Sequence, residues 1–243
     1  MPDLLMTTNL LHAPPSNMAE TVASDLEGTL SSGVAWEGMR NYLIENGREK
    51  EYKRFFLRQM PRYALFKIGM VSRERMKTVW ILSLLALFAG YEPEQMSEMG
   101  QWVVEKELWP SRRQALLDEL LAHREQGRRV IITTGQFEPI LAEVLKKLNG
   151  IEGIGTAVRY ENGRFTGQIK GQLIQGPLKA ESLQPFTQDG RILAAYGDTE
   201  QDIPMLSISN QPVAVYPDQG LRRHAEAQGW RILEEAQTAK GNH

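Results

Sequence analysis

The sequence predicts an α/β fold, in which a mostly parallel sheet has helices on both faces and a block of helices is inserted after the first strand. Two observations predict this fold. From Arg128 onward, short apolar runs alternate with helical segments, as in parallel strands joined by crossover helices. Residues 36–126 instead show only helical periodicity and follow a single short strand, so we expect them to form a second lobe.

The first half of the chain holds the extension, the first strand and the helical block. Residues 1–17 contain a Pro-Pro pair and no sustained periodicity, which indicates an N-terminal extension. A short strand is expected at Glu20–Ser24. Between Trp36 and Gln126 an apolar residue recurs every three or four positions, which predicts four to six helices. We expect the breaks between them at Gly47, Pro61, Gly69, Gly90 and Pro110.

The second half alternates strands with helices. Val130–Thr133 is predicted as a buried strand and Glu138–Asn149 as a helix. An Asn-Gly pair at Asn162 predicts a hairpin between Thr156–Tyr160 and Arg164–Ile169. The remaining elements, in chain order, are a strand at Ile192–Tyr196, a helix at Gln201–Ile208, a strand at Val213–Tyr216, a helix at Gly220–Gln228 and a strand at Trp230–Leu233.

The composition excludes several classes of protein. The 243 residues carry 28 Lys and Arg against 30 Asp and Glu, a net charge of −2, whereas a nucleic-acid-binding protein needs a clustered surplus of cations. The chain has no cysteine, so disulfides, thiolate metal sites and a cysteine nucleophile are excluded. The N-terminus lacks the basic region of an export signal, which predicts a cytoplasmic location.

The most apolar stretch is Thr78–Gly90, and it lies within the helical block. It is too short to cross a bilayer, which needs about 20 apolar residues, so no transmembrane segment is expected. We interpret it as a buried helix. The alternative is an apolar surface for a lipid-like substrate or a membrane edge.

Polar side chains follow three of the predicted strands. Asp25 and Glu27 follow the first strand, Thr133 and Thr134 follow the second, and Asp198 follows the strand at Ile192–Tyr196. Ligands of such sheets bind beyond the carboxyl ends of the strands, so these side chains are expected to meet at one edge.

The chemistry of these side chains suits a hard divalent cation. Asp25, Asp198 and Asp202 form an all-oxygen set, and Mg²⁺ prefers one or two carboxylates together with phosphate and water. Close carboxylates repel one another unless a cation neutralises them. None of the four histidines is expected near these strand ends, so a zinc site is not predicted; they are His12, His123, His224 and His243.

An aspartate beside a metal can attack phosphorus and form an aspartyl-phosphate. Charge that develops on the phosphoryl oxygens needs donors, and Thr134, backbone N–H groups after Glu27 and a lysine can supply them. Lys179 is the candidate lysine, with Lys170 as the alternative. Glu27 points to the same side as Asp25 along an extended chain, so it can give a proton to the leaving alcohol and later take one from water.

Four segments, in this order, resemble the motifs of the haloacid dehalogenase superfamily: Asp25-Leu26-Glu27-Gly28-Thr29, Ile132-Thr133-Thr134-Gly135, Lys179, and Gly197-Asp198-Thr199-Glu200-Gln201-Asp202. The helical block is similar to that of the helical-cap members. Residues 160–233 resemble the phosphoserine-phosphatase-like subgroup. The resemblance implies a Rossmann-like core formed by residues 18–35 and 126–243, with an inserted all-helical cap domain at residues 36–125.

The resemblance also implies a role for each matching residue. Asp25 would be the nucleophile and a metal ligand, and Glu27 the general acid and base with its backbone carbonyl on Mg²⁺. Asp198 would bind the metal directly and Asp202 directly or through water. The phosphate-binding residues would be Gly28, Thr134, Gly135 and Lys179, where Thr133 competes with Thr134 for the role of the hydroxyl donor.

Two features depart from the family pattern: Glu27 stands where the family usually has aspartate, and the first strand is more polar than the apolar run that usually precedes the nucleophile. In addition, Ser31–Ala35 carries no charge where phosphoserine enzymes have a glutamate, and Glu37 could replace that glutamate only with a shifted helix start. We therefore expect a magnesium-dependent phosphatase that acts on a small phosphomonoester other than phosphoserine, with an apolar portion that contacts cap aromatics. The alternatives are a phosphotransferase that uses the same phosphoenzyme and a phosphate-binding or interaction module without turnover.

Overall fold

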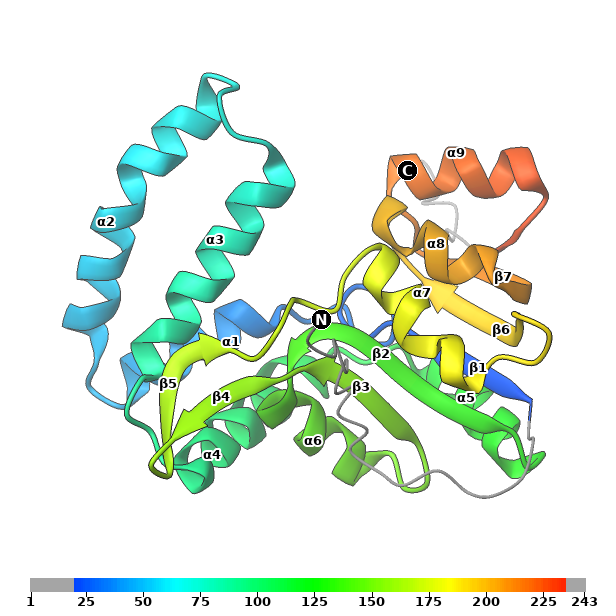
Figure 1. Cartoon of the computed structure of the whole chain (residues 1–243), viewed down its shortest axis with the longest axis horizontal. Helices are drawn as coiled ribbons and strands as arrows, with labels where there is room; N and C mark the ends of the chain where they lie inside the picture. Colours follow the sequence, from blue (N-terminus) through cyan, green and yellow to red (C-terminus); the bar gives the residue numbers. More distant parts are fainter. Residues whose placement is uncertain (1–19, 235–243) are drawn as a thin grey trace, which may run out of the picture.

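The computed structural model describes residues 20–234, and the predicted extension at residues 1–17 lies outside them. Its central feature is a six-stranded sheet in the order β3-β2-β1-β6-β7-β8, in which every neighbouring pair is parallel (Figure 1). The strands are β1 (Thr21–Ser24), β2 (Arg129–Phe137), β3 (Glu152–Thr156), β6 (Ile192–Gly197), β7 (Ser209–Val215) and β8 (Arg231–Leu233). This confirms the predicted α/β class.

The strand order reverses next to β1. From β1 the chain moves outward through β2 to β3, and it then returns to β6 on the other side of β1 before moving outward again through β7 and β8. The gap between the carboxyl ends of β1 and β6 is therefore the point where the topology switches direction. Ligands of open α/β sheets bind at such a point.

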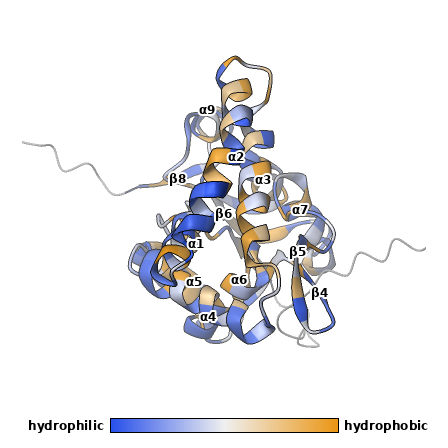
Figure 2. Cartoon of the chain, turned by 90° about the vertical axis from the view of Figure 1, so that its left-hand side faces the viewer, coloured by the Kyte–Doolittle hydropathy of each residue, from blue (hydrophilic) through white to orange (hydrophobic). Residues whose placement is uncertain are grey.

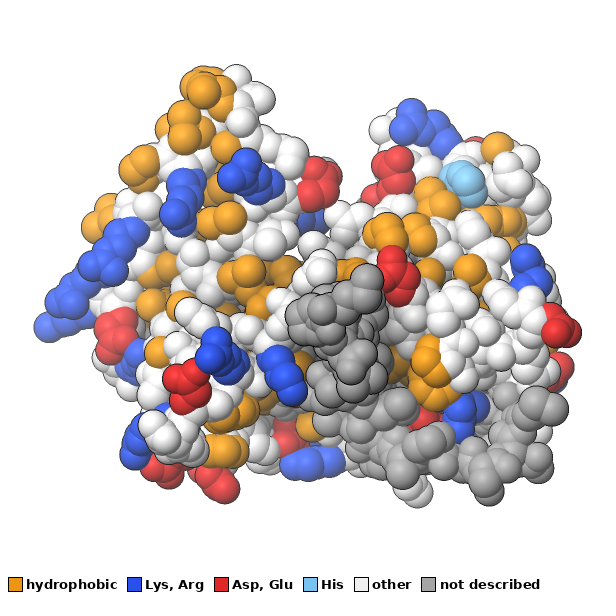
Figure 3. Space-filling model, in the orientation of Figure 1, with side chains coloured by type: hydrophobic (Ala, Val, Ile, Leu, Met, Phe, Trp, Pro, Cys, Tyr) orange, Lys and Arg blue, Asp and Glu red, His pale blue; other side chains and the backbone are white. Residues whose placement is uncertain are grey.

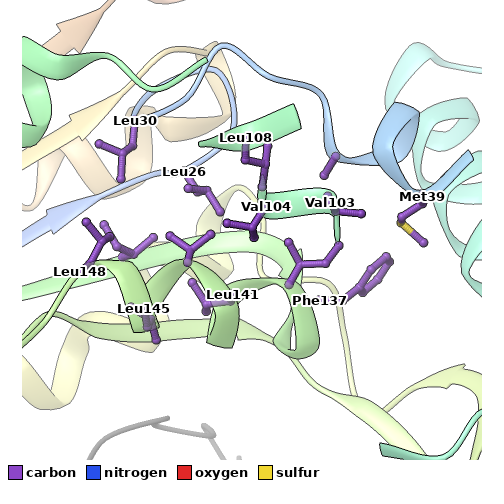
Figure 4. Close-up of a cluster of buried hydrophobic side chains, with 14 of the residues drawn as sticks. Leu26, Leu30, Met39, Val103, Val104, Leu108, Phe137, Leu141, Leu145 and Leu148 are labelled. Carbon is purple, nitrogen blue, oxygen red and sulfur yellow. The ribbon is translucent and has the colours of Figure 1, made fainter. Parts of the chain in front are cut away.

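Helices cover both faces of the sheet, as predicted. One face is covered by α5 (Gln114–Glu125) and α6 (Glu138–Lys147), and the other by α7 (Pro177–Leu183), α8 (Ile203–Ser207) and α9 (Gln219–Gln228). Successive residues of β1 point to opposite faces: Val22 packs in the cluster that contains Leu141 of α6, and Ala23 in the one that contains Leu183 of α7. In Figure 4, Leu141 and Leu145 lie beneath Leu26 and Val104.

The inserted helices are α1 (Ala35–Glu45), α2 (Glu49–Lys67), α3 (Arg73–Leu85) and α4 (Pro93–Val103), with short helical segments η1 (Ala86–Phe88) and η2 (Val104–Leu108). With α5, residues 36–126 thus contain five α-helices, within the predicted range. In Figure 1, α2 and α3 form a hairpin that projects away from the sheet. Residues 20–234 contain no helix with the length and apolarity that a bilayer crossing needs.

Two expectations about these helices need correction. Pro61 was expected to end a helix, but it lies inside α2. Its ring is on an exposed side of the helix, where water can satisfy the carbonyl group that loses its N–H partner. Thr78–Gly90 is not buried throughout: Leu84, Leu85 and Phe88 are buried, whereas the residues of α3 that precede them are only half-buried.

The contacts of α5 bear on where the cap ends. This helix packs against β2, and its Glu119 accepts a hydrogen bond of 2.7 Å from the Tyr196 hydroxyl of β6. Before α5 begins, the chain returns to the segment that leads into the inserted helices: the Ser32 N–H donates to the Ser111 carbonyl at 3.0 Å. The cap boundary at residue 125 stays a prediction, and these contacts favour a return to the core near Ser111.

The second half of the chain contains one strand that the sequence does not reveal. The hairpin is present as β4 (Val158–Glu161) and β5 (Arg164–Ile169), with Asn162 and Gly163 both at positive φ as the Asn-Gly signal predicts. The strand β3 precedes it and holds Gly153 and Gly155. A Cβ atom at Gly153 would lie 2.7 Å from a Leu145 methyl carbon, so glycine lets α6 pack closely on β3.

Candidate active site

The site is built where the sheet switches direction. Asp25 follows β1 directly, and its backbone N–H donates to the Tyr196 carbonyl of β6 at 2.9 Å, which extends the pairing of the two strands by one residue. Asp198 follows β6. Side-chain oxygens of Asp25, Asp198 and Asp202 all lie within 4.8 Å of one another. Segments that are far apart in the sequence therefore bring three carboxylates to one point.

Lys179 joins this cluster from the first turn of α7. Its side chain is buried, and Nζ lies 2.9 Å from Asp25 Oδ1 and 2.6 Å from Asp202 Oδ1. Lys170 is exposed in the segment between β5 and α7. Of the two candidate lysines, the structure therefore places Lys179 beside the carboxylates.

Asp202 is fully buried and has a clear local role. Its Oδ2 accepts hydrogen bonds from the backbone N–H groups of Asp198 (3.2 Å) and Thr199 (3.0 Å) and from the Thr199 hydroxyl (3.0 Å). This is a capping box at the start of η4 (Glu200–Asp202). The same side chain thus begins the helix and contacts Lys179.

Gly28 allows the loop after β1 to approach Asp198. Its φ is +90°, and a Cβ atom at this position would lie 2.0 Å from Asp198 Oδ2, so any other residue would be strained and would displace the Asp198 carboxylate. Thr29 Oγ1 donates to Asp198 Oδ1 at 2.9 Å. Arg113 fixes the same loop from the start of α5, because its guanidinium donates to the carbonyls of Gly28 and Thr29 and lies over the Tyr216 ring at 4.2 Å.

Glu27 is held at the border between core and cap. Its Oε2 accepts hydrogen bonds from Gln136 Nε2 and from the N–H of Ala35, the first residue of α1, at 3.4 Å. Burial raises the pKa of Glu27 to about 7, and the Ala35 and Gln136 donors oppose that rise. A carboxyl with this pKa can both give and take a proton near neutral pH.

The two candidate threonines lie on opposite sides of β2. Thr133 Oγ1 is 3.4 Å from the Ser182 hydroxyl of α7, and Thr134 Oγ1 accepts from the Gln136 N–H at 3.2 Å. Both are buried. Gly135, the next residue of β2, uses its carbonyl to accept from Thr156 Oγ1 at 2.9 Å, which joins this part of β2 to β3.

Burial and mutual repulsion shape the charges of the cluster. Burial, reinforced by Asp25 and Asp202, raises the pKa of Asp198 to about 7. Burial also raises the pKa of Asp25, although Lys179 opposes the shift. Burial alone would lower the pKa of Lys179, but Asp202 and Asp25 raise it above its ordinary value, so this amine is charged at neutral pH.

These residues fit a divalent cation. The three side chains supply only oxygen, which is the donor that Mg²⁺ selects, and burial together with neighbouring carboxylates raises the pKa values of Asp25 and Asp198, as expected where negative charges crowd together. His123 and His224 lie elsewhere, against Tyr196 and Trp230, and His12 and His243 lie outside the described residues. A nitrogen ligand from His123 or His224 is therefore not part of this site.

A cleft of about 760 Å³ opens between the cap and the core beside this cluster. Glu74, Thr78 and Leu82 of α3 line its cap side, and Leu178 and Pro204 lie on the core side. Leu178 directly precedes Lys179, and Pro204 comes two residues after Asp202, so the cleft borders the site.

Sequence reasoning missed three residues that organise this site. Thr29 could have been found, because it lies within the first motif and carries a hydroxyl. Gln136 comes two residues after Thr134, and only its contact with Glu27 reveals its role. Arg113 gave no signal at all, since it reaches the loop after β1 from 84 residues along the chain.

Comparisons with known proteins agree with this architecture. Residues 22–207 match the model of the haloacid dehalogenase-like hydrolases. A phosphoserine phosphatase of Mycobacterium tuberculosis is 25% identical over 232 residues, which is 90% of this chain and 72% of that protein.

Two solved structures share the fold. A protein of unknown function from Bordetella pertussis superposes with a TM-score of 0.72 at 22% identity, covering 89% of this chain and 99% of that one. A phosphoserine phosphatase in complex with its substrate superposes with a TM-score of 0.60 at 16% identity, covering 89% of this chain and 93% of that one. The motifs, the strand order and the family match together establish that this chain belongs to the haloacid dehalogenase-like hydrolases.

Proposed function

We propose that this protein is a magnesium-dependent phosphatase that hydrolyses a small phosphomonoester through an aspartyl-phosphate on Asp25. One observation carries the proposal: the buried Asp25 carboxylate lies 2.9 Å from the Lys179 amine, within a cluster of three carboxylates at the switch point of the sheet. The relative from Mycobacterium tuberculosis, which is named a phosphoserine phosphatase, supports the same class of reaction.

Asp25, Asp198 and Asp202 would hold the metal, together with the Glu27 carbonyl that the family resemblance implies. Bound Mg²⁺ supplies charge neutralisation for the phosphoryl oxygens and for the carboxylates around it. Lys179 is oriented by Asp25 and Asp202, so its amine can donate to a phosphoryl oxygen that approaches Asp25. Thr134 and the N–H groups of the loop at Gly28 and Gly135 would complete the phosphate site.

The reaction then has two steps. A carboxylate oxygen of Asp25 attacks phosphorus, the bond between phosphorus and the alcohol oxygen breaks, and protonated Glu27 gives its proton to that oxygen. In the second step the Glu27 carboxylate takes a proton from water as the water oxygen attacks phosphorus. Inorganic phosphate leaves, and Asp25 is restored. A pKa of about 7 lets Glu27 act in both steps.

The surroundings of the site favour an ester with an apolar portion over phosphoserine. Ser31–Ala35, which leads into the cap, contains no charged side chain that could pair with an ammonium or carboxylate group. The cleft presents Leu82, Leu178 and Pro204 as apolar surface, and Glu74 and Glu200 are its charged lining residues. Apolar surface of this kind is buried favourably by the apolar part of a substrate.

A phosphate-release screen tests the proposal. Sugar, amino-acid, nucleotide and lipid-headgroup monoesters are each incubated with the chain in Mg²⁺ and in EDTA. We expect release only with Mg²⁺, loss of all turnover in Asp25→Asn, and unchanged turnover in Asp189→Asn, which alters an exposed turn in the same way. Turnover in EDTA would reject the metal, turnover by Asp25→Asn would reject the nucleophile, and a highest specificity constant for phosphoserine would reject the substrate class.

A further inference from the structure

The α2–α3 hairpin exposes an unusual amount of apolar surface. Residues 20–234 have eight large apolar side chains that are strongly exposed, and seven of them lie between residues 56 and 70. Three of these, Leu57, Ile68 and Met70, are about 70% exposed. The others are Phe56, Met60, Tyr63 and Leu65. An apolar patch of this kind on a water-soluble surface marks a contact with a partner or a membrane.

The patch exists because α2 packs along only one side. Its buried residues are Phe55 and Gln59, and the ring of Phe55 lies 5.0 Å from that of Trp80 on α3. The rest of the α2 surface carries the exposed apolar side chains, of which the Phe56 ring also lies 5.9 Å from the Trp80 ring of α3, and the turn between the two helices adds Ile68 and Met70. Figure 2 shows hydrophobic segments along α2 and at the end of the hairpin, interrupted by hydrophilic ones.

The same hairpin is strongly basic. Residues 49–85 contain nine Lys and Arg against three Glu, a net charge of +6, so the remaining residues of the chain carry −8. Arg54, Arg58 and Arg62 are spaced four residues apart and therefore form one exposed row along α2. Figure 3 shows apolar side chains at the end of the hairpin and basic ones along its outer side.

Only part of this positive charge is neutralised within the hairpin. Lys53 pairs with Glu49 at 2.7 Å, whereas across residues 20–234 neither Arg58 nor Arg62 forms an ion pair: Arg62 donates to the Gln59 side chain at 3.3 Å, and the Lys67 amine lies 5.4 Å from the centre of the Tyr63 ring. Unpaired cations beside exposed apolar side chains are the pattern of helices that lie in the interface of an anionic membrane. There the cations neutralise lipid head groups and the apolar residues enter the acyl boundary.

We propose that the α2–α3 hairpin docks this protein onto the surface of an anionic lipid bilayer. A second copy of the chain fits less well, because a two-fold contact through this face would bring two hairpins of charge +6 together. Single-stranded nucleic acid fits less well too, because it stacks on aromatic rings, whereas the most exposed residues here are Leu57, Ile68 and Met70. A lipid surface matches both the charge and the aliphatic side chains.

Docking in this way would turn the cleft toward the bilayer. Its cap side is formed by Glu74, Thr78 and Leu82 of α3, the second helix of the hairpin. Figure 1 shows the direction in which the hairpin projects, and Figure 3, in the same orientation, shows a notch between the hairpin and the core that opens in that direction. The docking itself does not depend on the proposed phosphatase activity.

Sedimentation of the full chain with sucrose-loaded vesicles tests the proposal. We expect binding to vesicles with roughly a third phosphatidylglycerol in phosphatidylcholine, weak binding to phosphatidylcholine alone, and release by salt. The triple variant Arg54→Gln, Arg58→Gln, Arg62→Gln should lose about a hundredfold in partition coefficient. The matched control Arg159→Gln, Lys170→Gln, Arg223→Gln removes three exposed cations outside the hairpin and should bind like wild type.

Two further measurements complete the test. The triple variant Leu57→Ser, Ile68→Ser, Met70→Ser should lose at least tenfold in partition coefficient, about the effect of exposing apolar area to water. In the wild-type chain, anionic vesicles should protect the amides of residues 56–70 from hydrogen exchange, which needs no folded variant. Absence of binding to anionic vesicles, or equal binding by the cation variant, would overturn the proposal. The proposal would also be overturned if the chain associated with itself in solution, if the Leu57→Ser, Ile68→Ser, Met70→Ser variant abolished that association, and if anionic vesicles protected none of the amides of residues 56–70.

Discussion

Replacing Lys179 with methionine should destabilise the folded chain by about 3–5 kcal/mol at neutral pH, because one partner of a buried ion pair is lost. Only 5% of Lys179 is exposed, and its amine contacts Asp25 at 2.9 Å and Asp202 at 2.6 Å. Methionine keeps most of the side-chain volume, so the loss reports the missing charge rather than a cavity.

The loss of stability in Lys179→Met has an upper bound. One proton taken up by the two carboxylates that Lys179 contacts would replace the positive charge of the missing amine. From the ordinary aspartate pKa of 3.8, protonating one carboxyl costs about 4 kcal/mol at pH 7 and about 2 kcal/mol at pH 5. The sign follows because Lys179 lowers the pKa of Asp25, so that its removal raises the folded-state pKa of this carboxyl. The folded variant therefore suffers no penalty below about pH 4 and loses stability as the pH rises through the folded pKa.

Urea unfolding in EDTA, followed by tryptophan fluorescence, measures the free energy of unfolding and its dependence on pH. Lys179→Met and wild type are compared at pH 5 and at pH 7, with Lys170→Met as the control at an exposed lysine. We expect the control to change stability by less than about 0.5 kcal/mol at either pH. A loss below about 1 kcal/mol for Lys179→Met at pH 7, the value of a surface pair, would refute the reasoning, as would equal losses at the two pH values.

Three further predictions concern the same site. Glu27→Gln should lower kcat/KM by about 10²–10⁴-fold. It should also remove the decline in kcat/KM that we expect for the wild type above pH 7, where Glu27 loses its proton; a pH–rate profile that matches wild type would move the acid role elsewhere. Gly28→Ala should cost about 1–3 kcal/mol more than Gly47→Ala in urea unfolding, since both glycines have positive φ but only Gly28 contacts Asp198; equal costs would contradict the close approach. Saturating Mg²⁺, at about a hundred times its Kd, should stabilise the fold by about 2.7 kcal/mol and raise Tm by about 5–10 °C, and an unchanged Tm would argue against a metal at this cluster.

The parts of the fold that could be predicted are those with strong local patterns. The strand at Val130–Thr133 and the Asn162-Gly163 turn have apolar or turn residues that specify them locally, and both are present. The strand β3 was missed because Gly153 and Gly155 have low strand propensity. Their function is to admit α6, which is a tertiary requirement. At Pro61 the sequence predicts a helix break that the structure does not contain. The helix continues because the exposed carbonyl group that loses its N–H partner can accept a hydrogen bond from water instead.

The polar first strand shows how burial overrides residue type. Thr21 and Ser24 are both buried in β1, although the sequence there is more polar than a central strand usually is. The Thr21 hydroxyl donates to the Phe186 carbonyl at 2.8 Å, and the Ser24 hydroxyl donates to the Asp25 carbonyl at 2.8 Å. Because both hydroxyls are satisfied, their burial carries little cost. A local sequence pattern cannot predict the partner of the Thr21 hydroxyl, since it lies 165 residues away along the chain.

The charge of the carboxylate cluster links these observations. Asp25, Asp198 and Asp202 carry three negative charges when ionised, and Lys179 returns one positive charge, which leaves a formal charge of −2 in a largely buried site. Burial makes that charge costly, so in the absence of a cation the fold lowers it by holding protons, and the pKa of Asp198 rises to about 7. A divalent cation balances the same charge without protons and leaves Asp25 ionised, which is the form that can attack phosphorus. The feature that makes the metal-free site unfavourable is therefore the one that, in the proposed reaction, would favour metal binding and keep Asp25 in its nucleophilic form.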